Sequence, residues 1–261
     1  GADIIINALP SKLIRVNMEK FVPFVKKGQI IVNVSKGIEE STLLRLSEVL
    51  EELFPENEVF TLCGPSHAEE VARDIPTACV IAGRNIETAK MLQGEFMNST
   101  FRVYVNEDII GVEMGAALKN VIALAAGMTD GLGFGDNTKA ALMTRGMTEI
   151  SRLGVAMGAD AMTFSGLSGI GDLIVTCTSM HSRNRRAGIL IGQGKTLDEA
   201  VEEVHMVVEG VNTAKAAKAL ADKYGVDMPI LEEINKVLFE NKNAREAVLS
   251  LMMREGRNEG I

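Results

Sequence analysis

One lysine interrupts an apolar helical stretch in the middle of the chain. Lys119 lies in the run GVEMGAALKNVIALAAGMTDGLGFGDN, residues 111–137. A salt bridge along a helix needs an acid three or four residues away, and positions 115, 116, 122 and 123 carry none. An ammonium buried among apolar groups can exchange a proton near neutral pH, because burial disfavours its charged form. The alternative is that the stem of Lys119 runs along the helix and its charge reaches water.

A glycine-rich segment supplies an acid for this lysine. In SGLSGIGDLIVTC, residues 165–177, three glycines at 166, 169 and 171 precede Asp172. Glycines let backbone segments approach one another closely. We therefore expect Asp172 to meet Lys119 across the domain, and the alternative is an ordinary turn with a capping aspartate.

Arginines crowd the first turn of a helix that we expect to begin after Ser182. Arg183, Arg185 and Arg186 all fall within that turn. Cations at a helix N-terminus oppose the helix dipole at a cost of roughly 0.3–1 kcal/mol each. A phosphate held by backbone N–H groups and an arginine fork would offset this cost. The alternative is a solvated basic turn.

Polar residues follow two of the predicted strands. Lys36 comes after an apolar run in VNVSKGIEE, and Gly64 and Ser66 follow another run in CGPSHAEEVA. Ligands of open α/β sheets bind at this carboxyl edge. We expect Ser66 to open a helix and His67 to be a surface residue at its start. No Cys or His spacing indicates a zinc site, so we expect no metal.

The composition is that of a globular protein. The chain has 261 residues, 46% of them hydrophobic, which is enough for one large domain or two ordinary ones. A net charge of -8 without a long basic run argues against nucleic acid as a partner. The odd number of cysteines (Cys63, Cys79 and Cys177) favours a reducing cytoplasm over a disulfide framework. No apolar run of about 18 residues and no leader is visible, so we expect neither export nor a membrane span.

Two periodicities divide the chain. Short apolar strand-like runs alternate with helical segments at residues 2–9, 29–35, 58–63, 77–83 and 100–105. This pattern predicts an α/β fold with a parallel sheet covered on both faces. From Glu107 onward the pattern is helical throughout, and we place the domain boundary near residues 105–110.

Capping signals mark where several helices should begin. Ser41 or Thr42 precedes LLRLSEVLEELF, and Asn85 precedes IETAKMLQGEFM. A capping box spans Thr196 and Glu199, and Pro229 stands at a further helix start. No strand is followed by the G-x-G-x-x-G pattern that binds a dinucleotide pyrophosphate. The GLGFGD at residues 131–136 follows a helix and is not that pattern.

Six motifs in order resemble the bacterial NAD(P)-dependent glycerol-3-phosphate dehydrogenases over essentially the whole chain. They are SKGIE, GPSHAEEVA, GAALKNVIALAAGMTDGLGFGDNTKAALMTRGMTEI, SGIGDLIVTC, SRNRR and VVEGVNTAKA. The resemblance implies the remainder of a Rossmann-type dinucleotide-binding domain in residues 1–106, followed by an all-helical substrate domain in residues 107–261. It also implies interconversion of sn-glycerol 3-phosphate and dihydroxyacetone phosphate with NAD or NADP, for glycerophospholipid synthesis in the cytoplasm.

The resemblance also assigns roles to residues. The proton-transferring lysine of the family falls on Lys119, with Asp172 to orient it. The substrate contacts fall on Lys36, Gly64, Ser66, Lys119, Asp172, Ser182, Arg183 and Asn184. The cofactor contacts fall on Lys36, Ala68, Arg183, Val207 and Glu209. Asn120 and Thr176 lie beside these positions.

One departure from the family concerns the start of the sequence. Family members begin with a G-x-G-x-x-G strand–turn–helix segment that precedes the point where this sequence starts. We therefore expect weak or no dinucleotide binding by the chain as given, and the choice between NAD and NADP usually depends on that segment. The sheet would also expose a strand edge, which favours self-association into a homo-oligomer.

Two alternatives remain at the level of sequence. A 3-hydroxyacid or 6-phosphogluconate type dehydrogenase also carries a lysine on a long helix of an all-α domain, although the arginine turn and GIGDLIVTC favour the triose phosphate. From another class, the chain could be a catalytically silent remnant that serves as an oligomerisation or binding module.

Overall fold

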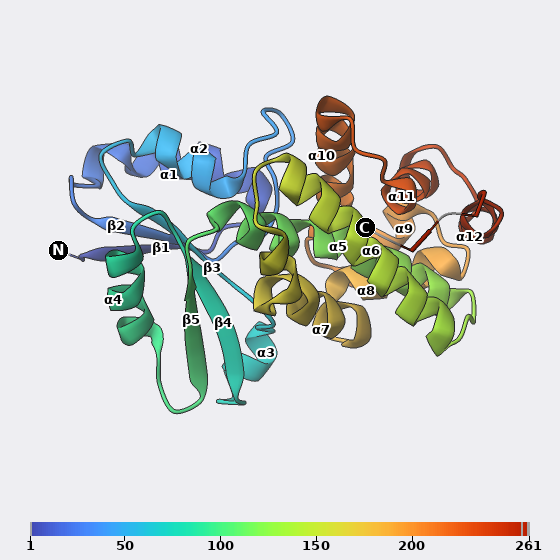
Figure 1. Ribbon diagram of the computed structural model, residues 1–261, viewed down its shortest axis with the longest axis horizontal. Helices are drawn as coiled ribbons and strands as arrows, with labels where there is room; N and C mark the ends of the chain where they lie inside the picture. Colours follow the sequence, from blue (N-terminus) through green and yellow to red (C-terminus); the bar gives the residue numbers. More distant parts are fainter. Residues whose placement is uncertain (1, 257, 260–261) are drawn as a thin grey trace.

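A computed structural model describes residues 2–256 and 258–259. A sheet with flanking helices lies beside a larger helical part (Figure 1). The strands are β1 (Ile4–Asn7), β2 (Ile30–Asn33), β3 (Val59–Cys63), β4 (Thr77–Ala82) and β5 (Phe101–Asn106). They form one sheet in the order β1-β2-β3-β4-β5. Four of them lie within the runs predicted from the sequence, and β5 extends one residue beyond its predicted run. Among the described residues no strand follows β5, so the α/β class with a helical C-terminal part is confirmed.

One strand pair departs from the predicted parallel sheet. β3 and β4 are antiparallel, whereas β1–β2, β2–β3 and β4–β5 are parallel. The connection from β3 to β4 holds only the single-turn helix α3 (Ala68–Val71), which is too short to carry the chain back along the sheet. The 11-residue helix α4 (Ile86–Phe96) does so between β4 and β5.

Helices cover both faces of the sheet, as predicted. α1 (Ile14–Met18) and α2 (Leu46–Leu53) pack on one face, which Ile31 and Val59 also enter. α4 packs on the opposite face with Val32 and Phe60. Adjacent residues of β2 and β3 thus point to opposite sides, so both faces are apolar and the strands read as continuous apolar runs.

The predicted helix starts were mostly right. Asn85 caps α4, and Thr196 forms the capping box of α9 with Glu199. The start at Ser41 or Thr42 was wrong, because α2 begins at Leu46 with Arg45 as its N-cap. Residues 39–44 instead form a turn in which Leu43 has a φ of 62°.

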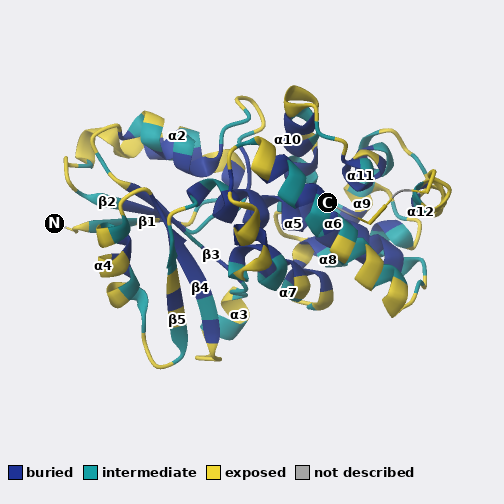
Figure 2. Ribbon diagram, viewed as in Figure 1, coloured by how far each residue is buried: buried dark blue, intermediate teal, exposed yellow. Residues whose placement is uncertain are grey.

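The long helix α5 (Ile109–Gly131) is the centre of the helical part. It contacts α6 (Asp136–Ala156), α7 (Asp172–Thr178), α8 (Arg183–Gly192) and α10 (Glu209–Tyr224). Within the described residues it alone has the length and apolarity to cross a membrane, but 94% of that window is buried inside the protein. Figure 2 shows this buried path through the helical part. α5 is therefore a core helix.

Shorter elements complete the chain. The remaining helices are α9 (Leu197–Val204), α11 (Pro229–Phe239, which begins at the predicted proline) and α12 (Ala244–Met252). Short 3-10 helices occupy Ser11–Leu13, Glu19–Phe24 and Ala161–Ser165, and a π-helical turn occupies Leu167–Gly171.

Candidate active site

Lys119 is buried on α5, with only 4% of its surface exposed. Its Nζ donates hydrogen bonds to Asp172 Oδ1 at 2.6 Å and to Thr176 Oγ1 at 2.6 Å. The partner missing along the helix therefore comes from α7. The alternative in which the lysine reaches water is wrong.

Asp172 lies between two ammonium groups. It is the first residue of α7 and is 1% exposed. Lys119 donates to its Oδ1, and Lys36 donates to its Oδ2 at 2.7 Å. Lys36 also donates to the carbonyl of Gly64 at 2.9 Å. The two lysines come from different parts of the fold and meet at one carboxylate, so Asp172 is not an ordinary turn cap.

The two lysines differ in their protonation. Burial, together with the neighbouring Lys36, lowers the pKa of Lys119 to about 8, while Asp172 opposes both effects. Burial also acts to lower the pKa of Lys36, but Asp172 and nearby cysteines outweigh it and raise that pKa above its usual value. Lys36 therefore stays charged near neutral pH, whereas Lys119 can both give and take a proton.

Close backbone contacts bring Asp172 to this position. A Cβ on Gly115, one turn before Lys119, would lie 2.7 Å from the carbonyl oxygen of Ser168. A Cβ on Gly169 would lie 2.1 Å from the carbonyl oxygen of Phe164. The glycine-rich segment thus packs backbone to backbone against α5 and against itself, which confirms the predicted tight approach.

The N-terminus of α8 lies near the lysines because α5 and α8 also pack through glycines. A Cβ on Gly188 would lie 2.1 Å from the carbonyl oxygen of Leu124, and one on Gly127 would lie 2.1 Å from that of Arg185. Any side chain at these positions would push the helices apart. The glycines of α5 and α8 therefore set the distance between Lys119 and the arginine turn.

The arginine turn has the predicted cap but only part of the predicted charge imbalance. Ser182 is the N-cap of α8, and its Oγ accepts a hydrogen bond from the Arg185 N–H at 3.2 Å. Arg185 itself pairs with Asp130 at 2.7 Å, and Lys139 pairs with the same carboxylate. Arg183 is exposed and lines the cleft. Arg183 is therefore the candidate arginine for binding the anion that we expected at this turn, because the charge of Arg185 is already neutralised by Asp130.

An asparagine connects three helices beside the lysine. Asn184 donates to Asn120 Oδ1 at 3.0 Å, and its own Oδ1 accepts from the Gly210 N–H at 2.8 Å. Asn184 is 7% exposed. This side chain therefore holds α5, α8 and α10 together at the edge of the site.

These groups surround one cleft of about 490 Å³. Most of the residues selected from the sequence line it: Lys36, Ser66, Ala68, Lys119, Asn120, Thr176, Ser182, Arg183, Asn184, Val207 and Glu209. Gly64 and Asp172 lie behind the lining and hold the two lysines. The structure thus brings together residues that are far apart in the sequence.

Two histidines of the cleft were missed at the level of sequence. His67 and His181 lie with their ring centroids 5.8 Å apart and both line the cleft. His67 was expected to be a surface residue, yet its Nε2 is buried without a hydrogen-bond partner. Burial, followed by the nearby Lys119 and Lys36, lowers the pKa of His67. Ser66 does not open the helix as expected, because α3 begins at Ala68 with His67 as its N-cap.

Glu209 makes a contact that the sequence did not indicate. Its carboxylate accepts hydrogen bonds from the Ser11 N–H at 3.1 Å and from Ser11 Oγ at 2.5 Å. Gly37 has a φ of 150°, and a Cβ there would lie 2.8 Å from the Ser11 Cβ. Glu209, at the start of α10, thus connects the helical part to the segment after β1.

One side of the cleft lies where an open α/β sheet binds a nicotinamide group. Its wall includes residues 8–10 and 34–36, which follow the carboxyl ends of the parallel strands β1 and β2. Ligands of open α/β sheets bind at this edge. Val207 and Met206 complete the wall from the helical part, and the residues present therefore fit the reactive end of a dinucleotide.

Comparisons with known proteins agree over nearly the whole chain. The family described as NAD-dependent glycerol-3-phosphate dehydrogenase matches with its N-terminal part over residues 1–89 and with its C-terminal part over residues 108–249. The glycerol-3-phosphate dehydrogenase (NAD(P)+) of Agathobacter rectalis is 61% identical over 98% of this chain and 76% of its own length. The enzyme of that name from Fusobacterium nucleatum is 60% identical over 98% of this chain and 77% of its own. The crystal structure of glycerol-3-phosphate dehydrogenase from Coxiella burnetii superposes with a TM-score of 0.94, at 35% identity, over 97% of this chain and 78% of that one.

Proposed function

Because the chain belongs to the family of NAD-dependent glycerol-3-phosphate dehydrogenases, we propose that it interconverts sn-glycerol 3-phosphate and dihydroxyacetone phosphate with NAD or NADP. The observation that carries this proposal is the buried Lys119, which donates to Asp172 at the wall of the cleft. Family membership also favours the triose phosphate over the 3-hydroxyacid and 6-phosphogluconate alternatives.

Lys119 is the proton donor and acceptor of this proposal. The nicotinamide, when bound, supplies or accepts the hydride at the substrate carbon. During reduction negative charge develops on the ketone oxygen, and the Lys119 ammonium gives it a proton. In the opposite direction the neutral amine takes the proton of the hydroxyl group. A pKa of about 8 suits both directions near neutral pH.

Asp172 and Thr176 orient this lysine. Both accept hydrogen bonds from Lys119 Nζ at 2.6 Å, which fixes the direction in which its remaining N–H points. Lys36 is the second cation beside the reacting oxygen, and its bonds to Asp172 and to Gly64 keep it in place. A fixed arrangement of charges costs no reorganisation during the reaction.

The substrate phosphate belongs at the N-terminus of α8. Arg183 supplies an exposed guanidinium, Ser182 caps the helix, and Asn184 adjoins both. Backbone N–H groups at a helix start and an arginine fork together suit a phosphate. Binding this remote group holds the carbonyl near Lys119.

For the cofactor we propose contacts from Lys36, Ala68, Arg183, Val207 and Glu209, of which Lys36 and Arg183 also serve the substrate. Lys36 and Arg183 are cationic, and Ala68 and Val207 are small or apolar. Glu209 already accepts hydrogen bonds from Ser11. It therefore also joins the two parts of the fold at the wall of the cleft.

We extend the proposal to the cellular role and organisation. The product glycerol 3-phosphate would feed glycerophospholipid synthesis in the cytoplasm, where the buried free thiols of Cys63, Cys79 and Cys177 stay reduced. The division into residues 1–106 and residues 107–261, and assembly into a homo-oligomer, belong to the same proposal. Size-exclusion chromatography with light scattering tests the last point.

Nicotinamide absorbance with dihydroxyacetone phosphate tests the proposed function. Turnover that is lost in Lys119→Met and absent with 6-phosphogluconate supports it. A folded protein without turnover would overturn it and would instead support a silent binding module.

A further inference from the structure

The segment of residues 34–45 carries Lys36 from β2 to α2. Within this segment Ile38 and Arg45 form an isolated antiparallel bridge. The Ser35 hydroxyl donates to the carbonyl of Leu9 at 2.5 Å, close to the strand. Lys36 therefore lies on a loop whose far end is fixed at Arg45.

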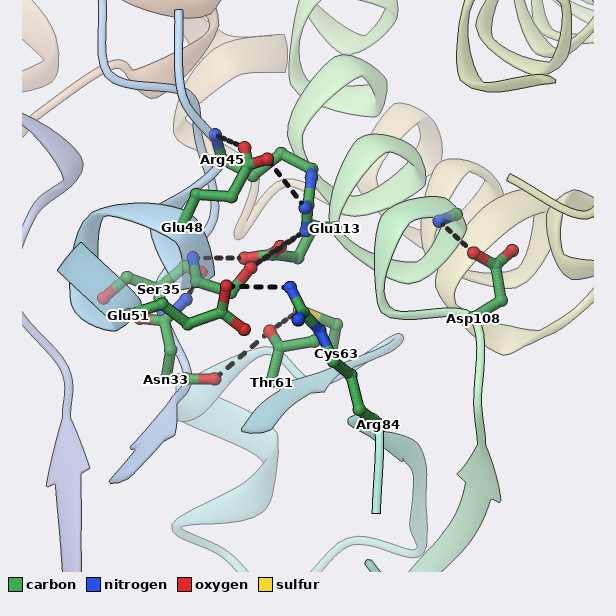
Figure 3. Close-up of polar contacts among 12 residues, drawn as sticks. Asn33, Ser35, Arg45, Glu48, Glu51, Thr61, Cys63, Arg84, Asp108 and Glu113 are labelled. Carbon is green, nitrogen blue, oxygen red and sulfur yellow. Dashed lines mark hydrogen bonds and ion pairs between the residues drawn. The ribbon is translucent and has the colours of Figure 1, made fainter. Parts of the chain in front are cut away.

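Arg45 is buried and bonded to a glutamate of α5. Its Nη1 donates to Glu113 Oε2 at 2.6 Å, and both residues are 5% exposed (Figure 3). Glu113 also accepts from the Ser47 N–H at 2.9 Å and from the Ser47 hydroxyl at 2.5 Å. Its carboxylate thus lies at the first turn of α2, where the helix dipole favours a negative charge.

The reaction described above uses neither residue. Burying two charges costs desolvation free energy, so a role in fixing one arrangement of the chain accounts for this pair better than a gain in stability does. This pair joins α5, which carries Lys119, to the loop that carries Lys36. The two lysines meet only at Asp172, so their separation depends on how this loop lies against α5.

We propose that Glu113 and Arg45 are positioning residues, which hold the loop of residues 34–45 against α5 so that Lys36 reaches Asp172. The inference rests on the proposed function for its purpose, but the arrangement itself concerns only contacts within the chain. On this proposal, the distance between Lys36 and Lys119 depends on a buried ion pair that lies outside the cleft.

Releasing the loop would change the protonation of Lys119. The charged or titratable groups that act on Lys119 are Asp172 on α7, Lys36 on the loop, His67 before α3 and Cys177 on α7. If Lys36 withdraws, Lys119 loses a repelling cation and no longer shares the carboxylate. Both changes favour the ammonium, so the pKa of Lys119 should rise.

Glu113→Gln is the variant that tests this. Gln keeps an acceptor for the Ser47 N–H and removes the charge that Arg45 needs, while Arg45 keeps its ion pair with Glu48 at 3.0 Å. Glu149→Gln is the matched control. Glu149 is also a buried glutamate that accepts from backbone N–H groups at a helix start, but it holds α11 and lies outside the cleft lining.

The measurement is NMR titration of the protein labelled with 13C at the lysine ε-carbons, with Lys119→Met to assign the signal. We expect the Lys119 midpoint to rise by about half a pH unit or more in Glu113→Gln and to stay unchanged in Glu149→Gln. An unchanged midpoint in folded Glu113→Gln would overturn the proposal, as would an equal rise in both variants.

A milder variant covers the case in which Glu113→Gln does not fold. Ser47→Ala removes the hydroxyl that bonds to both members of the pair, where it accepts from Arg45 Nη1 at 2.9 Å and donates to Glu113 Oε2 at 2.5 Å. The pair is thereby loosened, so a smaller rise in the same midpoint is expected, and no rise would contradict the proposal. Because the titration needs no turnover, it is independent of the activity assay. A shifted midpoint in a protein without dehydrogenase activity would keep the positioning role and reject the proposed function.

Discussion

Lys119 and Asp172 are 53 residues apart in the sequence, yet Nζ and Oδ1 lie 2.6 Å apart in the core. Lys36 meets the same carboxylate from the other side. The site therefore consists of one carboxylate between two ammonium groups, and only one of the two ammonium groups has a pKa near neutrality.

Replacing Lys119 by Met should abolish most of the activity. The methionine fills the apolar space but has no proton to transfer, and general acid–base groups contribute about 10²- to 10⁴-fold. We expect kcat to fall by that factor while the circular dichroism spectrum is unchanged. Lys218→Met is the control, because Lys218 pairs with Asp222 on the surface of α10, outside the cleft lining. A Lys119→Met enzyme with parental kcat would contradict the proton-transfer role.

The two directions of the reaction should depend on pH in opposite ways. Reduction needs the Lys119 ammonium, and oxidation needs the neutral amine. Because burial lowers the pKa of Lys119 in the free protein to about 8, kcat/KM for reduction should decline as the pH rises through about 8, and kcat/KM for oxidation should increase over the same interval. Steady-state rates at substrate concentrations well below KM check this. Parallel profiles in the two directions would rule out Lys119 as the titrating group.

The sequence predicted the strands and the Lys119 site for physical reasons. Apolar runs of strand length are visible locally, and a lysine without a helical partner must find one elsewhere. The direction of β4 was not visible, because an apolar strand looks the same in both directions. The direction of β4 depends on α3 being a single turn. This helix is so short partly because it starts two residues later than Ser66 indicated.

Contacts between distant segments account for what the sequence missed. Ser11 and Glu209 are separated by 198 residues, and no local pattern connects them. His67 follows a Gly-Pro-Ser turn, which indicated a surface position, but the fold places His181 against it. In the sequence, Arg185 could not be distinguished from its neighbours in the basic turn. In the structure it pairs with Asp130 of α5.

Arg183 and Arg185 should behave differently although they occupy the same turn. Arg183→Ala should weaken binding of dihydroxyacetone phosphate about tenfold or more, because a hydrogen bond to a charged group is worth about 1.5–3 kcal/mol. Its melting temperature should stay near that of the parent, since the side chain is exposed. Arg185→Ala should instead lower the melting temperature, because Asp130 loses a partner. Equal losses of substrate affinity in the two variants would remove the phosphate role from Arg183.

Two glycine-to-alanine changes should have opposite effects on stability. A Cβ at Gly188 would lie 2.1 Å from the Leu124 carbonyl oxygen, so Gly188→Ala should lower the free energy of unfolding by about 1–3 kcal/mol. Gly94 lies inside α4 with nothing within 4 Å of its Cβ position, and Gly94→Ala should raise stability by about 0.5–1 kcal/mol. Urea denaturation measures both. A stable Gly188→Ala protein would show that α5 and α8 can separate without loss.

Glu149 should make stability depend on pH. Burial raises the pKa of Glu149 from 4.5 to about 7, although the N–H groups of Ile230 and Leu231 oppose this. The folded state therefore binds a proton that the unfolded state releases between about pH 4.5 and 7, and the free energy of unfolding contributed by this group falls as the pH rises through that interval. The neutral amide introduced by Glu149→Gln cannot ionise, so that variant is free of this loss.

The expected result is that Glu149→Gln gains stability relative to the parent between about pH 5 and pH 8, on the order of 1–3 kcal/mol. Urea denaturation of both proteins at each pH gives this double difference, in which the other titrating groups cancel. A difference that is constant with pH would mean that Glu149 is already ionised at the acidic end of this interval in the folded protein. The two N–H bonds from α11 would then outweigh the burial of the carboxylate.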